Sequence, residues 1–586
     1  MQDRWYQRAI FYSLDADSFQ DADGDGIGDF VGLTSRLDYL ARLGVSCLWL
    51  SPIHPTPNRD DGYDVCDFYA IDPRLGTFGD FVELLQQAQD RGLRVIIDLV
   101  LNHTSDQHPW FQAARSDPRS PWRDWYVWSR SEPEHRTDGV VFPGHQEATW
   151  TYDDVADAWY HHRFYAHQPD LNWANPAVRA EMAKVVGFWL RLGVAGFRMD
   201  AAPFVFEDTR PDRAQPRRDY EWLEQFCRDL RYRDGAALVL AEANVERDEV
   251  REFFGGGDRL PMLFNFALNQ RTFLGLARSS AAPIREALRA MPAIPETCSW
   301  ATFMRNHDEI DLSGLSPSER EECFEAFGPE PTMRLYDRGI RRRLAPMLGN
   351  DRRRIELAYA LQCSLPGSPV IRYGEEIGMG EDLSLPERNA IRTPMQWSDA
   401  RNGGFSTAAK RKLMRPLVSG RPFGFEQCNV DAQRDDDASL LAWFERLLRA
   451  RRECGELGAN TAGLLDTGHE EVLGLRYTSE RTSLVVLSNL SDEPRVVDLT
   501  ASVVDEPRRV LELFANRRYD TRPDALDALE LDGLGYRWLR LDDRPEPAQR
   551  PDLAPPAAAG ERRRCCPTPG REAVGPRWVR SSRRSA

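Results

Sequence analysis

The sequence lacks several features that would mark other classes of protein. No apolar run is long enough to cross a membrane, and the first six residues carry no apolar signal region, so a cytoplasmic protein is expected. Positive charge is scarce: the formal net charge is −16, which argues against nucleic acid as a partner. The ten cysteines show no paired spacing typical of a metal centre, and Cys47 and Cys363 lie in apolar runs, which suits reduced core thiols.

What the sequence does contain is a regular alternation of short apolar runs and helical patterns over 586 residues, of which 41% are hydrophobic. Eight runs are expected to be strands: 9–14, 45–53, 94–100, 193–203, 236–244, 262–266, 300–305 and 369–376. Strand–helix alternation with polar residues at strand ends is typical of parallel α/β architecture. Eight such units predict a (β/α)8 TIM barrel, whose active site lies at the carboxyl ends of its strands.

Two interruptions divide the chain into four parts. Residues 104–172 are rich in Trp, Tyr, His, Pro and Asp, and they are expected to form an inserted subdomain after strand three that overhangs the site. From 456 to 543 short alternating runs predict a C-terminal antiparallel β domain, a sandwich. The barrel then comprises 1–103 and 173–455, and the Pro-, Ala- and Arg-rich residues 544–586 are expected to be disordered.

The fourth predicted strand ends in charged residues, although the rest of it is small and apolar. Arg198 and Asp200 are two residues apart, so both point to the same side of a strand, and Pro203 stops the strand just beyond them. Charges at the mouth of a buried strand are costly unless they are paired or functional. A purely structural ion pair is the alternative interpretation.

Three carboxylates close predicted strands four, five and seven: Asp200, Glu242 and Asp308. In a barrel these strand ends converge on one pocket, and crowded carboxylates push one another's pKa values apart, leaving one ionised and one protonated. Glycoside chemistry with retention needs such a pair, a nucleophile and an acid. Arg198 favours the ionised form of Asp200, which predicts Asp200 as nucleophile and Glu242 as acid/base. His103 and His307 also follow strand ends.

Residues 21–29 form an acidic turn in which aspartates alternate with glycines, a pattern that offers oxygen ligands to calcium. An EF-hand loop would need a glutamate near position 32, where this chain has Gly32. The pattern therefore predicts a structural ion loop rather than a calcium sensor, and a solvated acidic turn is the alternative.

Four stretches in chain order carry a family likeness: DLVLNH at 98–103, GFRMD at 196–200, AEAN at 241–244 and RNHD at 305–308. Together they resemble the motif set of the α-amylase superfamily, glycoside hydrolase family 13. QPDLN at 168–172 is similar to the branch that holds oligo-1,6-glucosidases, α-glucosidases and trehalose synthases. Within that branch, NHTSDQH at 102–108, GIRRRLAP at 339–346, GNDRRR at 349–354 and RTPMQW at 392–397 resemble the trehalose synthases.

This resemblance implies roles for individual residues. It makes Asp200 the nucleophile, Glu242 the acid/base and Asp308 the stabiliser of the transition state. The substrate-binding positions that it implies, with Glu309 next to Asp308 added, are Asp60, Tyr63, His103, Arg198, His307, Glu309 and Arg401. Arg401 matches an arginine that pairs with the acid at the position of Asp60 and shuts the pocket around one glucose. Such a closed pocket would let freed glucose be reglucosylated before water intervenes.

The resemblance also implies two structural Ca²⁺ ions and no organic cofactor. The first would be held by Asp21, Asp23, Asp25, Ile27 and Asp29. The second would be held by Asn102, Asp170, Glu207 and the carbonyls of Phe204 and Val205. The chain departs from the family in two places: 12–19 read YSLDADSF where Tyr-Glu-Val-x-Val-Arg-Ser-Phe is usual, and Arg372 replaces a tyrosine.

The function expected from the sequence is that of a retaining maltose α-D-glucosyltransferase that interconverts maltose and trehalose by double displacement. An exo-acting α-glucosidase that hydrolyses maltose is the first alternative, and an inactive sugar-binding homologue is the second. The expected partners are small α-glucosides, namely maltose, trehalose and short maltooligosaccharides, with neither nucleic acid nor membrane; self-association into a homo-oligomer is left open.

Overall fold

The structure is a computed structural model, and it describes residues 4–210, 217–479, 482–503, 509–519 and 526–542. The predicted disordered tail, 544–586, lies outside the described residues.

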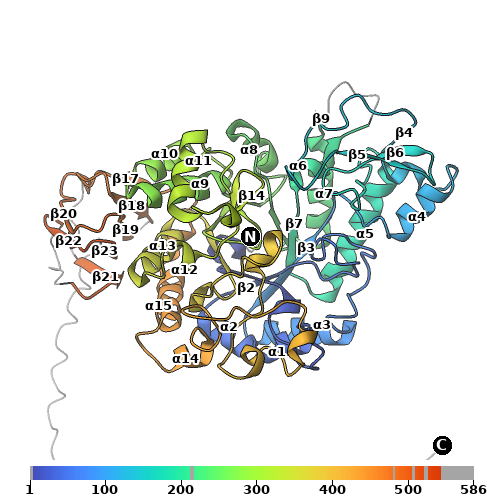
Figure 1. Ribbon diagram of the computed structural model, residues 1–586. Coiled ribbons are helices and arrows are strands. Elements are labelled where there is room, and N and C mark those ends of the chain that lie inside the picture. Colours follow the sequence, from blue (N-terminus) through green and yellow to red (C-terminus); the bar gives the residue numbers. More distant parts are fainter. Residues whose placement is uncertain (1–3, 211–216, 480–481, 504–508, 520–525, 543–586) are drawn as a thin grey trace, which may run out of the picture. The chain divides into compact units, whose positions relative to one another are not determined.

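Eight parallel strands close into a barrel in the order β1-β16-β12-β11-β10-β7-β3-β2 (Figure 1). Their bounds are Phe11–Leu14 (β1), Cys47–Leu50 (β2), Arg94–Leu99 (β3), Gly196–Met199 (β7), Leu238–Ala241 (β10), Met262–Phe264 (β11), Ser299–Phe303 (β12) and Ser368–Arg372 (β16). Buried side chains such as Trp49, Ile96 and Leu240 fill the interior of the barrel. Six of the eight strands fall within the predicted runs, whereas β12 and β16 each begin one residue earlier, at Ser299 and Ser368. The predicted TIM-barrel fold is confirmed.

Helices surround the barrel: α1 Phe30–Ser35, α2 Leu37–Leu43, α3 Phe78–Asp90, α5 Pro176–Leu192, α7 Tyr220–Arg233, α8 Arg247–Phe254, α9 Phe266–Arg278, α10 Ala282–Ala290, α11 Pro317–Phe327, α13 Arg352–Ser364 and α15 Leu440–Glu453. Local sequence sets the ends of these helices. In α5, the Asn175 side chain accepts a hydrogen bond from the backbone of Ala177 at 2.9 Å, and Pro176 occupies the first helical position. Gly193, at φ 107°, ends the helix and turns the chain into β7.

The segment after β3 forms a small lobe of its own, at the upper right in Figure 1. It contains α4 (Pro109–Ser116) and an antiparallel sheet of order β4-β6-β5, with bounds Trp128–Ser129, Trp150–Asp153 and Ala158–His161. Stacked and edge-on aromatic pairs, such as Phe111 with Trp128 at 5.6 Å, make up its core. A bridge between His103 and Asp170 joins the start and the end of the segment. This lobe overhangs the carboxyl end of the barrel, where Phe142 and Phe164 line the site cavity described below.

The C-terminal region contains a five-stranded antiparallel sheet of order β17-β18-β19-β23-β21 and a two-stranded sheet, β20-β22. The bounds are Gly463–Leu465, Val472–Thr478, Thr482–Asn489, Arg495–Val497, Arg509–Ala515, Leu529–Leu531 and Tyr536–Asp542 for β17 to β23. It packs against α13 and α15, where Trp443 Nε1 donates to Tyr536 OH at 2.6 Å and Tyr536 OH donates to Glu356 at 3.1 Å. The predicted antiparallel C-terminal region is present.

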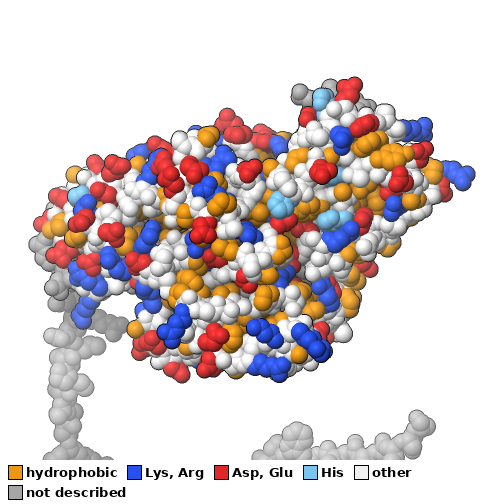
Figure 2. All heavy atoms as spheres, viewed as in Figure 1, with side chains coloured by type: hydrophobic (Ala, Val, Ile, Leu, Met, Phe, Trp, Pro, Cys, Tyr) orange, Lys and Arg blue, Asp and Glu red, His pale blue; other side chains and the backbone are white. Residues whose placement is uncertain are grey.

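The connections contain further short elements: α6 Ala202–Val205, α12 Leu344–Met347, α14 Val430–Arg434, β8 Glu207–Asp208 with β9 Arg217–Arg218, and a sheet of β13 (Ile310–Asp311), β15 (Gly339–Ile340) and β14 (Arg334–Leu335). Short 3-10 helices include η6 Glu387–Ile391 and η7 Arg401–Gly404. On the face drawn in Figure 2, acidic and basic side chains are mixed over the surface. Among the described residues, no helix combines the length and apolar character that a membrane crossing requires.

Candidate active site

The carboxyl ends of three adjacent strands, β3, β7 and β10, are joined by backbone hydrogen bonds just where the acidic residues begin. Asp200 N donates to Leu99 O at 3.3 Å, and Glu242 N donates to Met199 O at 3.1 Å. Ala202 N in turn donates to Glu242 O at 3.0 Å. Ala201, directly after Asp200, adopts a left-handed conformation with φ 46°, a strained geometry that turns the chain sharply into α6. The positions of Asp200 and Glu242 are therefore fixed relative to each other by the backbone.

Arg198 is the centre of the acidic cluster. Its Nη1 lies 2.6 Å from Asp98 Oδ1 and 2.8 Å from Asp200 Oδ1, and its Nη2 pairs with Glu242 Oε2. The pairing of Arg198 with Asp200 is the one that their spacing predicts. Because Arg198 is only 1% exposed, one buried cation neutralises part of the charge of three carboxylates.

The pKa values of the two predicted catalytic acids are both raised. Burial raises the pKa of Asp200 to about 6, although the neighbouring Arg198 lowers it. Burial raises the pKa of Glu242 to about 7, again against the effect of Arg198 and assisted by the charges of Asp200 and Asp308. Near neutral pH the first carboxyl is mostly ionised while the second still carries a proton part of the time, which is the division of labour that a nucleophile and an acid/base need.

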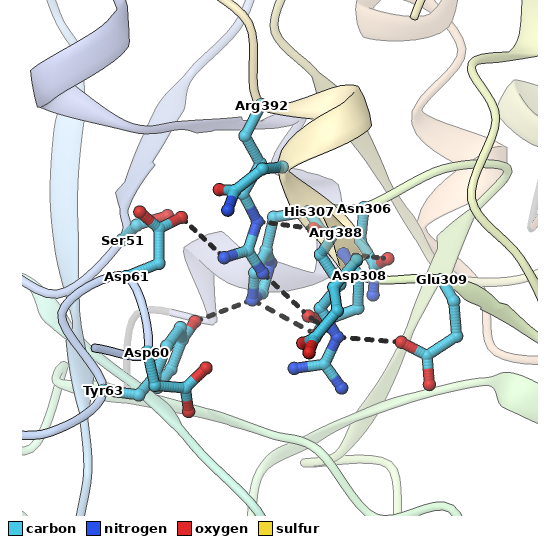
Figure 3. Close-up of polar contacts among 12 residues, drawn as sticks. Ser51, Asp60, Asp61, Tyr63, Asn306, His307, Asp308, Glu309, Arg388 and Arg392 are labelled. Atoms are coloured by element: carbon cyan, nitrogen blue, oxygen red, sulfur yellow. Dashed lines mark hydrogen bonds and ion pairs between the residues drawn. The ribbon is translucent and has the colours of Figure 1, made fainter. Parts of the chain in front are cut away.

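Asp308 has a different environment, because two arginines and a buried histidine lie against it (Figure 3). Arg392 Nη2 lies 3.0 Å and Arg388 Nε lies 3.2 Å from its Oδ1, and His307 Nε2 lies 3.2 Å from its Oδ2. Burial alone would raise the pKa of Asp308, but Arg388, His307 and Arg392 hold it well below its ordinary value. Asp308 therefore keeps a permanent negative charge at the pocket, which suits a residue that stabilises positive charge in a transition state.

Tyrosine, histidine and tryptophan rings lie next to these acids. The Tyr63 ring is stacked on His307 with ring centroids 5.7 Å apart, and Tyr63 OH lies 2.7 Å from His307 Nε2. Tyr63 OH also donates to Asp98 at 3.2 Å, and Asp98 accepts from Trp49 Nε1 at 2.9 Å. His103 Nε2 lies 3.0 Å from the carbonyl oxygen of Tyr63, and burial lowers the pKa of His103 to about 4, so this ring is neutral at pH 7.

The acids open into one cavity of about 340 Å³. The predicted site residues that line it are Asp60, Tyr63, His103, Asp200, Glu242, Asp308 and Glu309. Arg198 and His307 are in contact with lining residues. A second cavity of about 730 Å³ adjoins the first and shares Arg218, Asn244, Phe266 and Ser313 with it.

Arg401 is the predicted site residue that the structure does not bring to the others. It lies exposed at the start of η7 and is not part of the cavity wall. Asp60, its expected partner, instead accepts a hydrogen bond from Gln168 Nε2 at 2.8 Å and lines the cavity together with Arg388. Burial raises the pKa of Asp60 to about 7, while Arg388 lowers it. The arginines beside the site come instead from residues 388–392, since Arg388 and Arg392 both contact Asp308.

Several residues of the site were not predicted from the sequence. Arg388 and Arg392 form ion pairs with Asp308, and Asp61 pairs with the same Arg392. Phe142 and Phe164 from the inserted segment line the cavity. The RTPMQW stretch contains Arg392, so this residue could have been selected from its motif. Arg388 and the two phenylalanines carry no comparable signal in the sequence.

The predicted metal ligands differ in how well they fit a cation. Ligand oxygens of Asp21, Asp23 and Asp29 lie within 4.8 Å of one another, and the backbone of Gly24 and Gly26 donates to Asp21 at 2.6 and 2.8 Å. Converging oxygens of this kind suit a hard divalent cation. In the same loop, the Asp25 side chain accepts from Ile27 N at 2.8 Å.

The second predicted set is engaged in other contacts. Asp170 pairs with His161 at 2.9 Å and accepts from Asn102 at 2.8 Å, and Glu207 pairs with Arg163 at 2.5 Å. Phe204 and Val205 belong to α6, and the Arg163 guanidinium lies 4.8 Å from the Phe204 ring. A guanidinium beside Glu207 competes with a metal ion for the same carboxylate, so this arrangement does not fit a cation, and the second ion stays a prediction.

The strand ends of this closed parallel barrel bring three carboxylates, a buried arginine and the Tyr63 and His307 rings together at one cavity. This combination is typical of barrel enzymes that act on glycosidic bonds. The family model described as the α-amylase catalytic domain matches residues 14–322 and 340–458. The chain belongs to the α-amylase family and is an enzyme of that family. The model described as the sucrose hydrolase-like C-terminal domain matches residues 482–540.

Relatives and solved structures agree with this assignment. A trehalose synthase of Thermus thermophilus is 44% identical over 501 residues, which are 85% of this chain and 52% of that protein, so the chain spans about half the length of that relative. A trehalose synthase/amylase TreS of Mycolicibacterium smegmatis is 40% identical over 563 residues, 93% of this chain and 94% of that protein. The crystal structure of the trehalulose synthase MutB from Pseudomonas mesoacidophila superimposes with a TM-score of 0.74 at 25% identity, over 92% of this chain and 99% of that one.

Proposed function

We propose that the protein interconverts maltose and trehalose by retaining glucosyl transfer. The observation that carries the proposal is the single cavity in which Asp200, Glu242 and Asp308 meet, with Asp200 and Glu242 on the same arginine. The names of the relatives, which include trehalose synthases of 40–44% identity, support the choice of sugars.

The proposed reaction has two displacements. Asp200 attacks the anomeric carbon of the glucose unit held against Tyr63, while Glu242 gives its proton to the leaving oxygen. Glu242 then takes a proton from the 1-hydroxyl of the released glucose, which has turned within the cavity and attacks the glucosyl–Asp200 ester. Because each displacement inverts the anomeric carbon, the new bond keeps the α configuration, and Asp308 stabilises the positive charge that develops on the ring in both steps.

Incubation of the protein with maltose alone tests this proposal. Trehalose as the main product, with a minor amount of glucose, is the expected outcome. Glucose as the sole product would show that water is the acceptor and that the protein is an α-glucosidase. An unchanged maltose pool would contradict both activities.

We also propose that Asp21, Asp23 and Asp29 hold a structural Ca²⁺ ion, for which the converging oxygens of the acidic loop are the support. The ion would tie the loop after β1 to the segment around Ser406, whose hydroxyl contacts Asp21. No step of the proposed reaction depends on it.

A further inference from the structure

Charged residues of alternating sign form a continuous series of ion pairs around Asp308, which we call the ion-pair network. In order of contact it consists of Asp17, Arg415, Asp61, Arg392, Asp308, Arg388, Glu309, Arg338 and Asp311. Its members lie in the connections that follow four barrel strands, β1, β2, β12 and β16, so the network ties these connections to one another. Asp308 lies at its centre, and Figure 3 shows the middle section of it.

The half of the network from Asp17 to Arg392 has no part in lining the sugar cavity. Asp61 does not line that cavity; it lines a neighbouring one of about 280 Å³, which shares Asp60 and Arg388 with the first. Arg392 nevertheless bridges Asp61 and Asp308, because it contacts Asp61 Oδ2 at 2.5 Å and Asp308 Oδ1 at 3.0 Å. Arg392 is 3% exposed, so its charge must be balanced by these two carboxylates.

Arg415 holds Asp61 in turn. Its Nη2 pairs with Asp61 Oδ1, its Nη1 donates to Ser18 Oγ at 2.8 Å, and its Nε donates to Asn389 Oδ1 at 3.1 Å. Asp17 lies 3.5 Å from the same guanidinium. Position 17 is one at which this chain departs from the family motif, having aspartate in place of arginine, and here Arg415 supplies the positive charge between Asp17 and Asp61.

We propose that Asp61, Arg415 and Asp17 are positioning residues for Asp308, acting through Arg392. If Asp61 lost its charge, Arg392 would be left with Asp308 as its main counter-ion and would move toward it. The Asp308 oxygens would then be drawn away from the sugar. Since Asp308 acts on the charge that develops in the transition state, the loss would appear in turnover more than in the binding of neutral substrate.

The inference rests on the proposed function for its kinetic test, and Asp61→Asn is the main variant. We expect kcat on maltose to fall about 10- to 100-fold, the size of effect that misplacement of a catalytic group produces, with KM changed less than about 3-fold. The inhibition constant of a cationic glucose-shaped iminosugar, 1-deoxynojirimycin, should rise together with the loss of kcat/KM, because its positive charge needs a well-placed Asp308.

Asp72→Asn is the matched control. Asp72 lies in the same β2–α3 connection, is equally an aspartate paired with an arginine (Arg74, 2.6 Å), and is 3% exposed, but it does not belong to the network. Asp72→Asn should lower the melting temperature while kcat and iminosugar affinity stay at wild-type values. Wild-type kcat in Asp61→Asn, or an iminosugar affinity no weaker than that of Asp72→Asn, would overturn the proposal.

Arg415 provides a second test if Asp61→Asn does not fold. Arg415→Lys keeps the charge but loses the bridging geometry, so it should retain more turnover and iminosugar affinity than Arg415→Gln. If Arg415→Lys and Arg415→Gln both fold and have equal turnover and equal iminosugar affinity, the proposal is wrong. If wild-type protein makes no product from maltose, the proposed function fails, while iminosugar binding, measured by calorimetry, still tests the positioning of Asp308.

Discussion

Arg198 determines the chemistry that the residues around it can perform. One buried guanidinium contacts Asp98, Asp200 and Glu242, so all three carboxylates can be placed close together without leaving the protein interior with unpaired charge. Burial raises the pKa of both catalytic acids, to about 6 for Asp200 and to about 7 for Glu242. The higher pKa of Glu242 agrees with its assignment as the acid and with that of Asp200 as the nucleophile.

Glu242→Gln tests the acid role. We expect turnover of maltose to fall about 10²–10⁴-fold, because the leaving oxygen no longer receives a proton. Formation of the glucosyl-enzyme from α-D-glucosyl fluoride should be nearly preserved, since fluoride leaves without protonation. The measurement is kcat/KM of the variant on maltose and on α-D-glucosyl fluoride. An equal fall in kcat/KM for the two substrates would show that Glu242 has a different role.

The pH dependence of activity follows from the same pair. The free enzyme is active when Asp200 is ionised and Glu242 protonated, so kcat/KM on maltose should fall below about pH 6, where Asp200 gains a proton. It should fall again above about pH 7, where Glu242 loses its proton. A profile that rises continuously from pH 5 to pH 9 would contradict this assignment.

At the scale of strands and loops, the site residues at strand ends could be predicted from the sequence, whereas the site residues that lie in long loops could not. Arg198, Asp200, Glu242 and Asp308 follow apolar runs whose convergence is a property of any closed parallel barrel, so their meeting could be predicted. Arg388 and Arg415 lie in segments without periodicity, where position depends on tertiary contacts that no local pattern encodes. The expected pairing of Arg401 with Asp60 failed for the same reason.

The acidic loop 21–29 is an element whose stability depends on an ion, if the proposed Ca²⁺ site is correct. Chelation with EDTA should lower the melting temperature, and added Ca²⁺ should restore it, because an ion present at 100 times its dissociation constant stabilises by about 2.7 kcal/mol. Asp23→Asn should abolish the response to Ca²⁺. An EDTA-treated protein with an unchanged melting temperature and no detectable bound metal would exclude the site.

At the scale of the whole molecule, three parts of the chain contribute to one cavity. The barrel supplies the carboxylates, the inserted segment supplies Phe142 and Phe164, and residues 388–392 supply the two arginines that contact Asp308. The C-terminal sheets contact α13 and α15 on the outside of the barrel through Tyr536, away from the cavity. The order of these parts along the chain could be predicted from composition and periodicity, whereas the loop contacts that complete the cavity could not.

The central claim is that Asp200 forms a covalent bond with the transferred glucose. Incubation of the protein with 5-fluoro-α-D-glucosyl fluoride, followed by peptide mapping in a mass spectrometer, tests it most directly, because the fluorine slows release of the sugar more than its attachment. We predict one fluoroglucosyl group, attached to Asp200. A label on Glu242 or Asp308, or an enzyme that releases fluoride in the first turnover without carrying a label, would contradict the account.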